Sequence, residues 1–244
     1  SYLTTDAERA RLLDSLGLDF LVLVAFNREL ASTPAGEFVE RLYRRLRMRE
    51  LWVGHDFALG KGRKGDIDTL RELGQSLGFR LKVVEPLYDH GEPISSTRIR
   101  QLLSEGRVSE AARLLGRYYS VSGVVSHGAA RGRKLGFPTA NLRIPSERAL
   151  PRDGVYAVWA LTGGEWFPGV ANIGIRPSFD AGEPLLEVHL MDYAGDLYDR
   201  PLRVEFVHRL RGEERFEDVQ ALIDQVHADM QVARELLGQR EPAR

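Results

Sequence analysis

The first half of the chain alternates between two hydrophobic patterns. Apolar residues recur at helical spacing in five segments, and they form short runs bounded by Gly, Pro or polar residues in three others. The first pattern predicts helices at residues 7–16, 34–46, 67–77, 96–103 and 109–115, and the second predicts strands at 20–26, 51–54 and 81–86. The run at 20–26 is apolar throughout, so we expect a buried strand there. Strands that alternate with helices predict a parallel sheet with helices on its faces.

After Gly116 the pattern changes to short β-type runs separated by Gly, Pro and Asp. These runs predict strands at 118–125, 155–161, 166–173, 185–191 and 202–209, and a final amphipathic helix is predicted at 216–237. Such spacing is typical of a small antiparallel barrel or sandwich. The chain thus predicts an α/β part followed by an all-β part with a C-terminal helix, and we place the boundary near residue 118, with domains at 1–117 and 118–244.

Composition limits the partners that we expect. The 244 residues include 34 Lys and Arg against 35 Asp and Glu, a formal net charge of −1, so nothing indicates bulk attraction to nucleic acid or to an anionic membrane. There is no cysteine, which excludes disulfides and thiol catalysis and fits a reducing cytoplasm. No apolar run reaches the length of a membrane span. We expect a cytoplasmic protein that acts on small molecules; the oligomeric state stays open.

The segment GAARGRKLGFPTAN at 128–141 carries the clearest chemistry. Three glycines at a spacing of four, Gly128, Gly132 and Gly136, stand among three basic residues, so backbone amides and cations could approach an anion closely. Thr139 and Asn141 are two residues apart, which on an extended segment points their oxygens the same way, as a hard cation requires. A site for a nucleoside triphosphate with Mg²⁺ is one interpretation. A Gly-rich, solvated hairpin is the other.

Further motifs give this segment a context. GRKLGFPTANL resembles the signature of riboflavin kinases, and several more motifs follow the order of the bacterial bifunctional riboflavin kinase/FAD synthetase (FMN adenylyltransferase) family. These motifs are VGHDFALGKGRKGD (53–66), ISSTRIRQLL (94–103), LLGRYYSVSGVV (114–125), GVYAVWA (154–160), GVANIGIRPSF (169–179), LLEVHL (185–190) and LRGEERF (210–216). The resemblance implies a partial Rossmann-like nucleotidylyltransferase domain followed by a riboflavin kinase barrel.

The resemblance also implies roles for residues of the second half. It implies that Thr139 and Asn141 hold the Mg²⁺ ion. It also implies that ATP is bound by Gly128, Gly132, Lys134, Gly136, Thr139 and Asn141. Glu187 in LLEVHL takes the place of the catalytic base that accepts the riboflavin hydroxyl proton. From the residues alone, ordinary turn hydrogen bonds for Thr139 and Asn141, and an outer-face position for Glu187, remain alternatives.

The flavin side of the site is implied by two further motifs. NIGIRPSF supplies Asn172, Gly174 and Arg176, and Ser178 stands where the family has threonine, a change that keeps the hydroxyl. LRGEERF supplies Arg211 on a flap that borders the flavin. A surface arginine that caps a helix is the alternative for Arg211.

In the first half, ISSTRIR resembles a nucleotidylyltransferase motif. Hydroxyls and arginines at a helix N-terminus suit a triphosphate, because free amides and the helix dipole favour anions there. The resemblance therefore implies nucleotide binding by Ser95, Ser96, Thr97, Arg98 and Arg100. A plain N-capped amphipathic helix is the alternative. Ala58 stands where the family usually has an aromatic residue or arginine.

One motif of the family is missing from the sequence. The adenylyltransferases carry HxGH after their first strand, whereas this chain opens on a predicted helix, and no two of its six histidines have that spacing. We therefore expect FMN adenylyltransferase activity to need a further N-terminal segment. The 244 residues alone are expected to make FMN but not FAD.

Three functions follow, in order of preference. The first is a riboflavin kinase that makes FMN from riboflavin and ATP with Mg²⁺. The second is a non-catalytic remnant that binds flavin or nucleotide. The third is an adenylyltransferase whose first half is the working part, while the barrel serves as a scaffold for a dimer.

Overall fold

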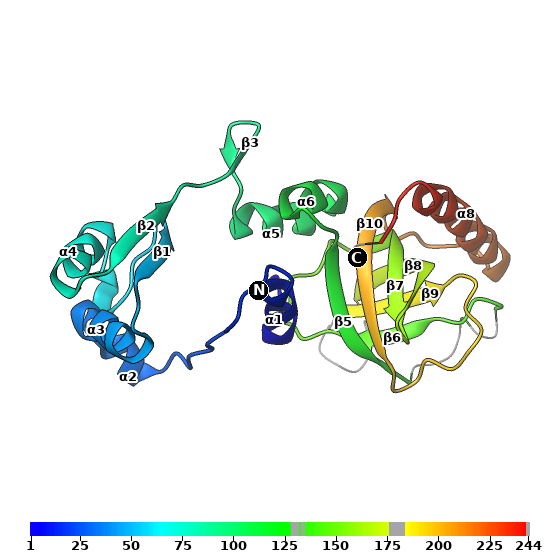
Figure 1. The fold of residues 1–244 in the computed structure, drawn as a ribbon. Helices are drawn as coiled ribbons and strands as arrows, with labels where there is room; N and C mark the ends of the chain where they lie inside the picture. The colour runs from blue at the N-terminus through cyan, green and yellow to red at the C-terminus, as the bar shows by residue number, and fades with distance from the viewer. Residues whose placement is uncertain (128–131, 133–134, 176–183, 243–244) are drawn as a thin grey trace. The chain divides into compact units, whose positions relative to one another are not determined.

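The computed structural model describes residues 1–127, 132, 135–175 and 184–242 (Figure 1). Contacts divide the chain into two compact units, Ser1–Leu12 with Ser95–Arg244, and Leu13–Ile94. In the described ranges, no helix combines the length and the hydropathy needed to cross a bilayer.

The unit at 13–94 is built around one parallel strand pair. β1 pairs with β2 in parallel register, from Glu50 opposite Arg80 to Gly54 opposite Val84. Between these strands the chain forms α4, which begins where the Asp66 side chain accepts from the Thr69 amide (3.0 Å) and ends at Gly78 with φ of 90°. The elements are α2 (Arg28–Ser32), α3 (Ala35–Leu46), β1 (Glu50–Gly54), η1 (Lys61–Arg63), α4 (Ile67–Leu77), β2 (Arg80–Val84), β3 (Tyr88–Asp89) and β4 (Glu92–Pro93).

The core of this unit lies between its helices and the strand pair. Val39 of α3, Leu70 of α4 and Phe79 before β2 are buried together. A strand, a helix that packs back on the sheet and a parallel strand make up a βαβ arrangement, so the predicted α/β class is confirmed for this part.

The strand predicted at 20–26 is wrong. These residues form no regular element, and Phe20 and Phe26 are 89% and 82% exposed. A strand requires a neighbouring strand to satisfy its amides and carbonyls. In the sheets of the described residues, only β1 and β2 pair in this α/β region, apart from the short hairpin of β3 and β4. The hydrophobic pattern shows that residues 20–26 are apolar, but it does not show whether another strand lies beside them to pair with.

The second unit contains a closed barrel of six antiparallel strands, in the order β10-β5-β6-β9-β8-β7 (Figure 1). The predicted barrel is confirmed, and one of its strands, β6, was not predicted. The strands are β5 (Tyr119–Ser126), β6 (Ala140–Arg143), β7 (Gly154–Thr162), β8 (Glu165–Ile175), β9 (Pro184–Leu190) and β10 (Pro201–Arg211).

Among the described residues, the helices of this unit are α1 (Asp6–Asp14, of which residues up to Leu12 belong to this unit), α5 (Ser96–Ser104), α6 (Val108–Leu115) and α8 (Val219–Gly238). α8 begins at Asp218, whose side chain accepts from the Ala221 amide (2.8 Å), and it buries Ala233 and Leu237 against the barrel wall. It therefore covers one part of the barrel with its apolar face.

The N-terminal residues are part of the barrel unit. Glu8 of α1 forms an ion pair with Arg148 at 2.7 Å, and their side chains are only 8% and 2% exposed. Arg148 also donates to the Ser120 carbonyl (2.6 Å), while the Tyr119 hydroxyl donates to the Ala149 carbonyl (2.5 Å). Burial raises the pKa of Tyr119 to about 12. Residues 1–12 are thereby joined to β5 and to the segment before β7.

Candidate active site

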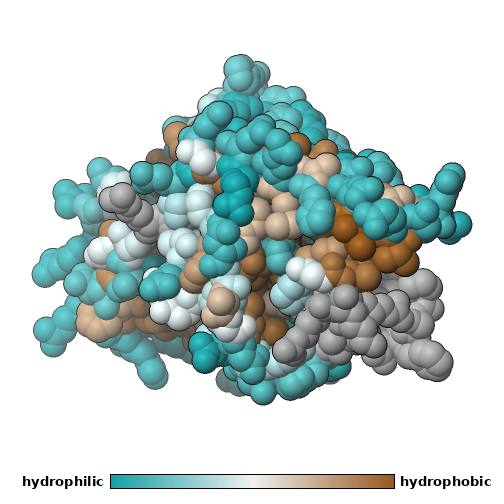
Figure 2. Space-filling view, turned by 90° about the vertical axis from the view of Figure 1, so that its right-hand side faces the viewer, coloured by the Kyte–Doolittle hydropathy of each residue, from teal (hydrophilic) through white to brown (hydrophobic). Residues whose placement is uncertain are grey.

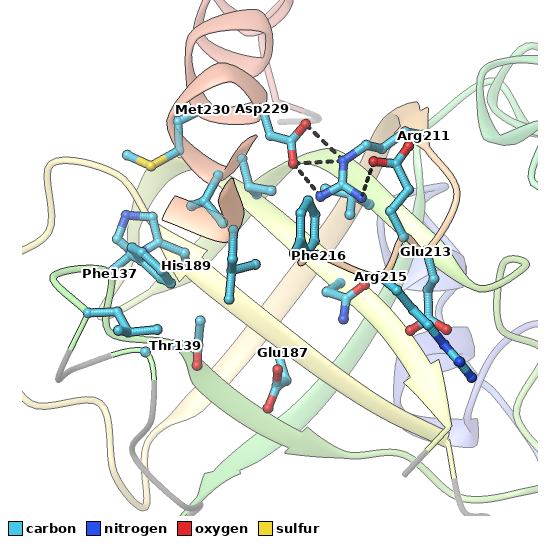
Figure 3. A pocket seen from close by; sticks show the side chains of 18 of the residues that line it. Phe137, Thr139, Glu187, His189, Arg211, Glu213, Arg215, Phe216, Asp229 and Met230 are labelled. Carbon is cyan, nitrogen blue, oxygen red and sulfur yellow. Dashed lines mark hydrogen bonds and ion pairs between the residues drawn. The ribbon is translucent and has the colours of Figure 1, made fainter. Parts of the chain in front are cut away.

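A cavity of about 870 Å³ opens between the barrel strands, α8 and the segment that follows β10 (Figure 3). Its lining combines polar and apolar side chains, with apolar surface from α8 and Phe216 as well as from the strands. The lining residues are Gly132, Leu135, Phe137, Thr139, Asn141, Val155, Val170, Asn172, Glu187, His189, Arg211, Glu213, Glu214, Arg215, Phe216, Leu222, Val226, Asp229 and Met230. Figure 2 shows one face of the molecule, on which apolar residues gather in patches among polar ones.

One row of residues crosses the barrel wall at this cavity. Glu187 of β9 lies opposite Asn141 of β6 on one side and opposite Asn172 of β8 on the other. The same row continues from Asn172 to Val155 of β7, and from Val155 to Arg211 of β10. Directly opposed residues of antiparallel strands point to the same face. All five line the cavity, so the register brings together side chains that are as far as 70 residues apart in the sequence.

His189 lies two residues beyond Glu187 on the same face of β9. Its Nδ1 is 2.9 Å from the Pro138 carbonyl oxygen. Because a carbonyl only accepts, Nδ1 carries the proton and donates. This hydrogen bond ties β9 to the backbone immediately before Thr139, and it gives His189 a supporting contact that the sequence pattern did not specify.

The turn before Thr139 is closed on Gly132. The amides of Leu135 and Phe137 both donate to the Gly132 carbonyl oxygen at 3.0 Å. A Cβ atom at position 132 would lie 2.5 Å from the Phe137 carbonyl oxygen, so only glycine allows this approach. Gly136 follows at φ of 93°. Gly128 and Lys134, the other residues expected to bind ATP, lie outside the described residues.

Thr139 and Asn141 both reach the cavity, which fits the expected oxygen ligands. Asn141 is only 6% exposed. Across the described part of the chain, no three His, Cys, Asp or Glu side chains converge as a metal site. A hydroxyl and an amide oxygen match the ligand preference of Mg²⁺, which is usually held by few protein groups together with substrate phosphates. The donor set therefore fits Mg²⁺.

Of the residues expected to bind flavin in the NIGIRPSF motif, the structure describes Asn172 and Gly174. Asn172 lines the cavity, and Gly174 lies beside it on β8 under the Glu213 carboxylate. A side chain at position 174 would overlap that carboxylate, which itself lines the cavity. Arg176 lies outside the described residues.

The far wall of the cavity comes from α8 and from residues 213–216. Asp229 of α8 forms a side-on ion pair with Arg211, which lies at the end of β10 (Figure 3). Phe216, Leu222, Val226 and Met230 supply apolar surface. The sequence motifs predicted that Arg211 lies at the flavin side of the site, but they did not indicate Asp229. The available signal was a carboxylate four residues before Ala233 and eight before Leu237, on the buried face of an amphipathic helix.

The five residues expected to bind nucleotide in the first half do not line this cavity. Ser95 caps α5 by accepting from the Arg98 amide (3.2 Å), as the capping alternative predicts. The Arg100 guanidinium Nε donates to the Ser1 carbonyl (2.8 Å). Ser96, Thr97 and Arg98 occupy the first turn of the same helix.

A riboflavin kinase family model matches residues 115–237, and an FAD synthetase family model matches residues 1–98. A bifunctional riboflavin kinase/FMN adenylyltransferase of Pseudomonas fluorescens is 42% identical over 232 residues, covering 94% of this chain and 74% of the relative. The protein of that name from Escherichia coli K12 is 41% identical over 244 residues, covering 99% and 77%.

A solved structure is similar as well. The crystal structure described as a macrolide-efflux protein from Streptococcus pneumoniae superimposes with a TM-score of 0.86 at 34% identity, covering 95% of this chain and 75% of that one. The chain thus spans about three quarters of the length of these relatives.

Proposed function

Since the chain belongs to the bifunctional riboflavin kinase/FMN adenylyltransferase family, we propose that it transfers the γ-phosphate of ATP to the 5′-hydroxyl of riboflavin, giving FMN and ADP. One observation carries the assignment of this reaction to the barrel. Glu187 lies in the cavity between Asn141 and Asn172, so a carboxylate stands between the residues expected on the nucleotide side and those expected on the flavin side.

In this proposal Glu187 is the general base. Its carboxylate accepts the proton of the 5′-hydroxyl as the hydroxyl oxygen forms a bond to the γ-phosphorus and the bond from that phosphorus to the ADP oxygen breaks. The neighbours of Glu187 in the register, Asn141 and Asn172, keep it at a fixed place across the barrel wall. Positioning of this kind supplies much of the acceleration in phosphoryl transfer.

Thr139 and Asn141 are proposed to hold Mg²⁺, and Gly128, Gly132, Lys134 and Gly136 to surround the phosphates. Mg²⁺ neutralises charge on the phosphate oxygens when it is bound. The Gly132 turn and the hydrogen bond from His189 to Pro138 hold Thr139 against the cavity. This side of the site therefore depends on backbone geometry as much as on side chains.

Asn172, Gly174, Arg176 and Arg211 are proposed to bind riboflavin. Polar groups on the strands face apolar side chains of α8 and Phe216 across the cavity. A flavin has a polar chain and a large aromatic ring, and a cavity whose lining offers both polar groups and apolar surface suits such a molecule.

The other half of the chain is proposed to serve FMN adenylyltransfer, with Ser95, Ser96, Thr97, Arg98 and Arg100 in nucleotide binding. We assign residues 118–244 to the kinase and 1–117 to the adenylyltransferase part, although residues 1–12 and 95–117 pack in the same compact unit as the barrel. The cytoplasmic location remains a prediction from the absence of cysteine.

The test is direct. Purified protein is incubated with ATP, Mg²⁺ and riboflavin, and the products are separated by chromatography. FMN and ADP in equal amounts, dependent on Mg²⁺, are expected. Folded protein that binds riboflavin yet yields no FMN would favour the non-catalytic remnant.

A further inference from the structure

The Arg211 guanidinium is held by two acceptor atoms of one carboxylate. Its Nε lies 3.1 and 3.0 Å from Oδ1 and Oδ2 of Asp229, and its Nη2 lies 2.8 Å from Oδ2 (Figure 3). Gln225, one turn earlier on α8, donates to the same carboxylate at 3.0 Å. A bidentate contact of this kind fixes direction as well as distance.

The position of Asp229 is one where packing alone favours an apolar residue. Asp229, Ala233 and Leu237 follow one another at a spacing of four and form the buried face of α8, and the Asp229 side chain is only 7% exposed. Removing a charge from water is costly, and a buried ion pair can often be replaced by apolar residues without loss of stability. Stability therefore gives little reason for a carboxylate there.

Arg211 joins Asp229 to the segment that follows β10. Its Nη1 donates to the Gly212 carbonyl (3.1 Å) and lies 3.9 Å from the Glu214 carboxylate. Its guanidinium carbon lies 5.6 Å from the centre of the Phe216 ring. Residues 212–216 form neither helix nor strand, and 213–216 line the cavity. Arg211 is thus the contact between a rigid helix and an irregular wall of the cavity.

We propose that Asp229 is a positioning residue for riboflavin: it orients Arg211, and through Arg211 it holds residues 212–216 as the wall against which the flavin binds. This inference rests on the proposed kinase function. Thr139 and Asn141 are held by other contacts, so the effect of Asp229 falls on the flavin and not on ATP.

The experiment is steady-state kinetics of Asp229→Asn, which keeps the shape of the side chain and removes its charge. The KM for riboflavin should rise about tenfold or more, because small displacements of positioning groups have effects of that size. The KM for ATP and kcat should stay within about twofold. In an Arg211→Met background, Asp229→Asn should add nothing further to the KM for riboflavin, because Asp229 acts through Arg211.

Glu205→Gln is the matched control. Glu205 is a fully buried carboxylate paired with Arg203 at 2.5 Å, and it does not line the cavity, so its loss tests general destabilisation. If Asp229→Asn fails to fold, Asp229→Glu, which keeps the charge and Arg211 but moves the carboxylate by one methylene group, is measured instead and should also raise the KM for riboflavin.

An unchanged KM for riboflavin in the folded variant would overturn the proposal. So would an equal rise in Glu205→Gln, or a further rise when Asp229→Asn is added to Arg211→Met. Wild-type protein that makes no FMN would contradict the proposed function instead, and a change in the binding of riboflavin, measured by flavin fluorescence, would still test Asp229.

Discussion

Asn141 and Glu187 stand directly opposite each other on the neighbouring strands β6 and β9, and both line the cavity. One belongs to the glycine-rich segment that is expected to bind ATP, and the other is the proposed base. Their opposition places the proposed metal ligand and the proposed base on one face of the barrel wall.

Replacing Glu187 by Gln should lower kcat by about 10²–10⁴-fold, the range for loss of a general base, since the amide cannot accept the proton. Riboflavin binding should persist because the side chain keeps its size. FMN formation and riboflavin fluorescence titration measure the two effects. Glu165→Gln, at an exposed position at the start of β8, is the control. Wild-type turnover in Glu187→Gln would show that the base lies elsewhere.

Thr139→Val and Asn141→Ala should each lower kcat by about 10²-fold or more, the scale reported for loss of a transition-state contact to charge. Each removes one oxygen from the proposed Mg²⁺ site, so added Mg²⁺ should restore part of the activity. Thr162→Val is the control, because its buried hydroxyl donates to the Pro201 carbonyl (3.2 Å) and does not line the cavity. Mg²⁺ titrations that coincide with those of the wild type would contradict the metal assignment.

Gly132→Ala should reduce kcat/KM for ATP by about tenfold or more through displacement of the turn before Thr139. The added methyl group would lie 2.5 Å from the Phe137 carbonyl oxygen, so the backbone must move. Gly36→Ala in α3 is the control. Its nearest contact is 3.8 Å away, and alanine should stabilise that helix by up to about 1 kcal/mol. Activity assays and thermal unfolding of both variants separate the two effects.

Glu8→Ala should destabilise the barrel unit by about 3–5 kcal/mol, because it leaves the Arg148 charge buried without its partner. The control is Glu37→Ala, which breaks an exposed pair with Arg41 and should cost only about 0.5 kcal/mol. Urea unfolding measures both changes. Equal losses would indicate that α1 does not contribute to the stability of the barrel.

A background in which Trp52 is replaced by Phe makes that measurement specific. The chain has three tryptophans, and the other two, Trp159 and Trp166, lie on β7 and β8. Fluorescence then reports on the barrel alone, and a transition that moves with Glu8 but not with Glu37 supports the assignment.

Burial raises the pKa of Tyr119 to about 12 from an ordinary value of 10.0, because the folded barrel favours the neutral phenol. The corresponding stability is therefore fully present below about pH 10 and is lost as the pH rises towards about 12. Tyr119→Phe should remove this part of the alkaline loss, while it costs about 1 kcal/mol at neutral pH through the lost hydrogen bond to Ala149.

Urea midpoints measured from pH 8 to 12 test the Tyr119 prediction. Tyr88→Phe, at an exposed position on β3, should leave the pH dependence unchanged. Parallel alkaline slopes in wild type and Tyr119→Phe would contradict it.

Local chemistry in the sequence predicted the longer helices and most of the barrel strands, although it missed the five-residue helix α2. The helix predicted at 67–77 has the same bounds in the structure, where Asp66 and Gly78 cap α4 through contacts within one turn. The alternation in LLEVHL placed Glu187 and His189 on one face of β9, since strand geometry alone sets it. The motifs around Thr139 and Asn141 indicated the family, which the comparisons confirmed.

Pairing and burial between distant segments were decided by the tertiary structure. The run at 20–26 is apolar enough for a strand but forms none, because a strand needs a partner that its own residues do not encode. The barrel register alone brings Asn141, Glu187 and Asn172 into one row. The contact between Asp229 and Arg211 depends on the packing of α8 on the barrel. The two residues are 18 positions apart, so their spacing along the chain does not predict an ion pair.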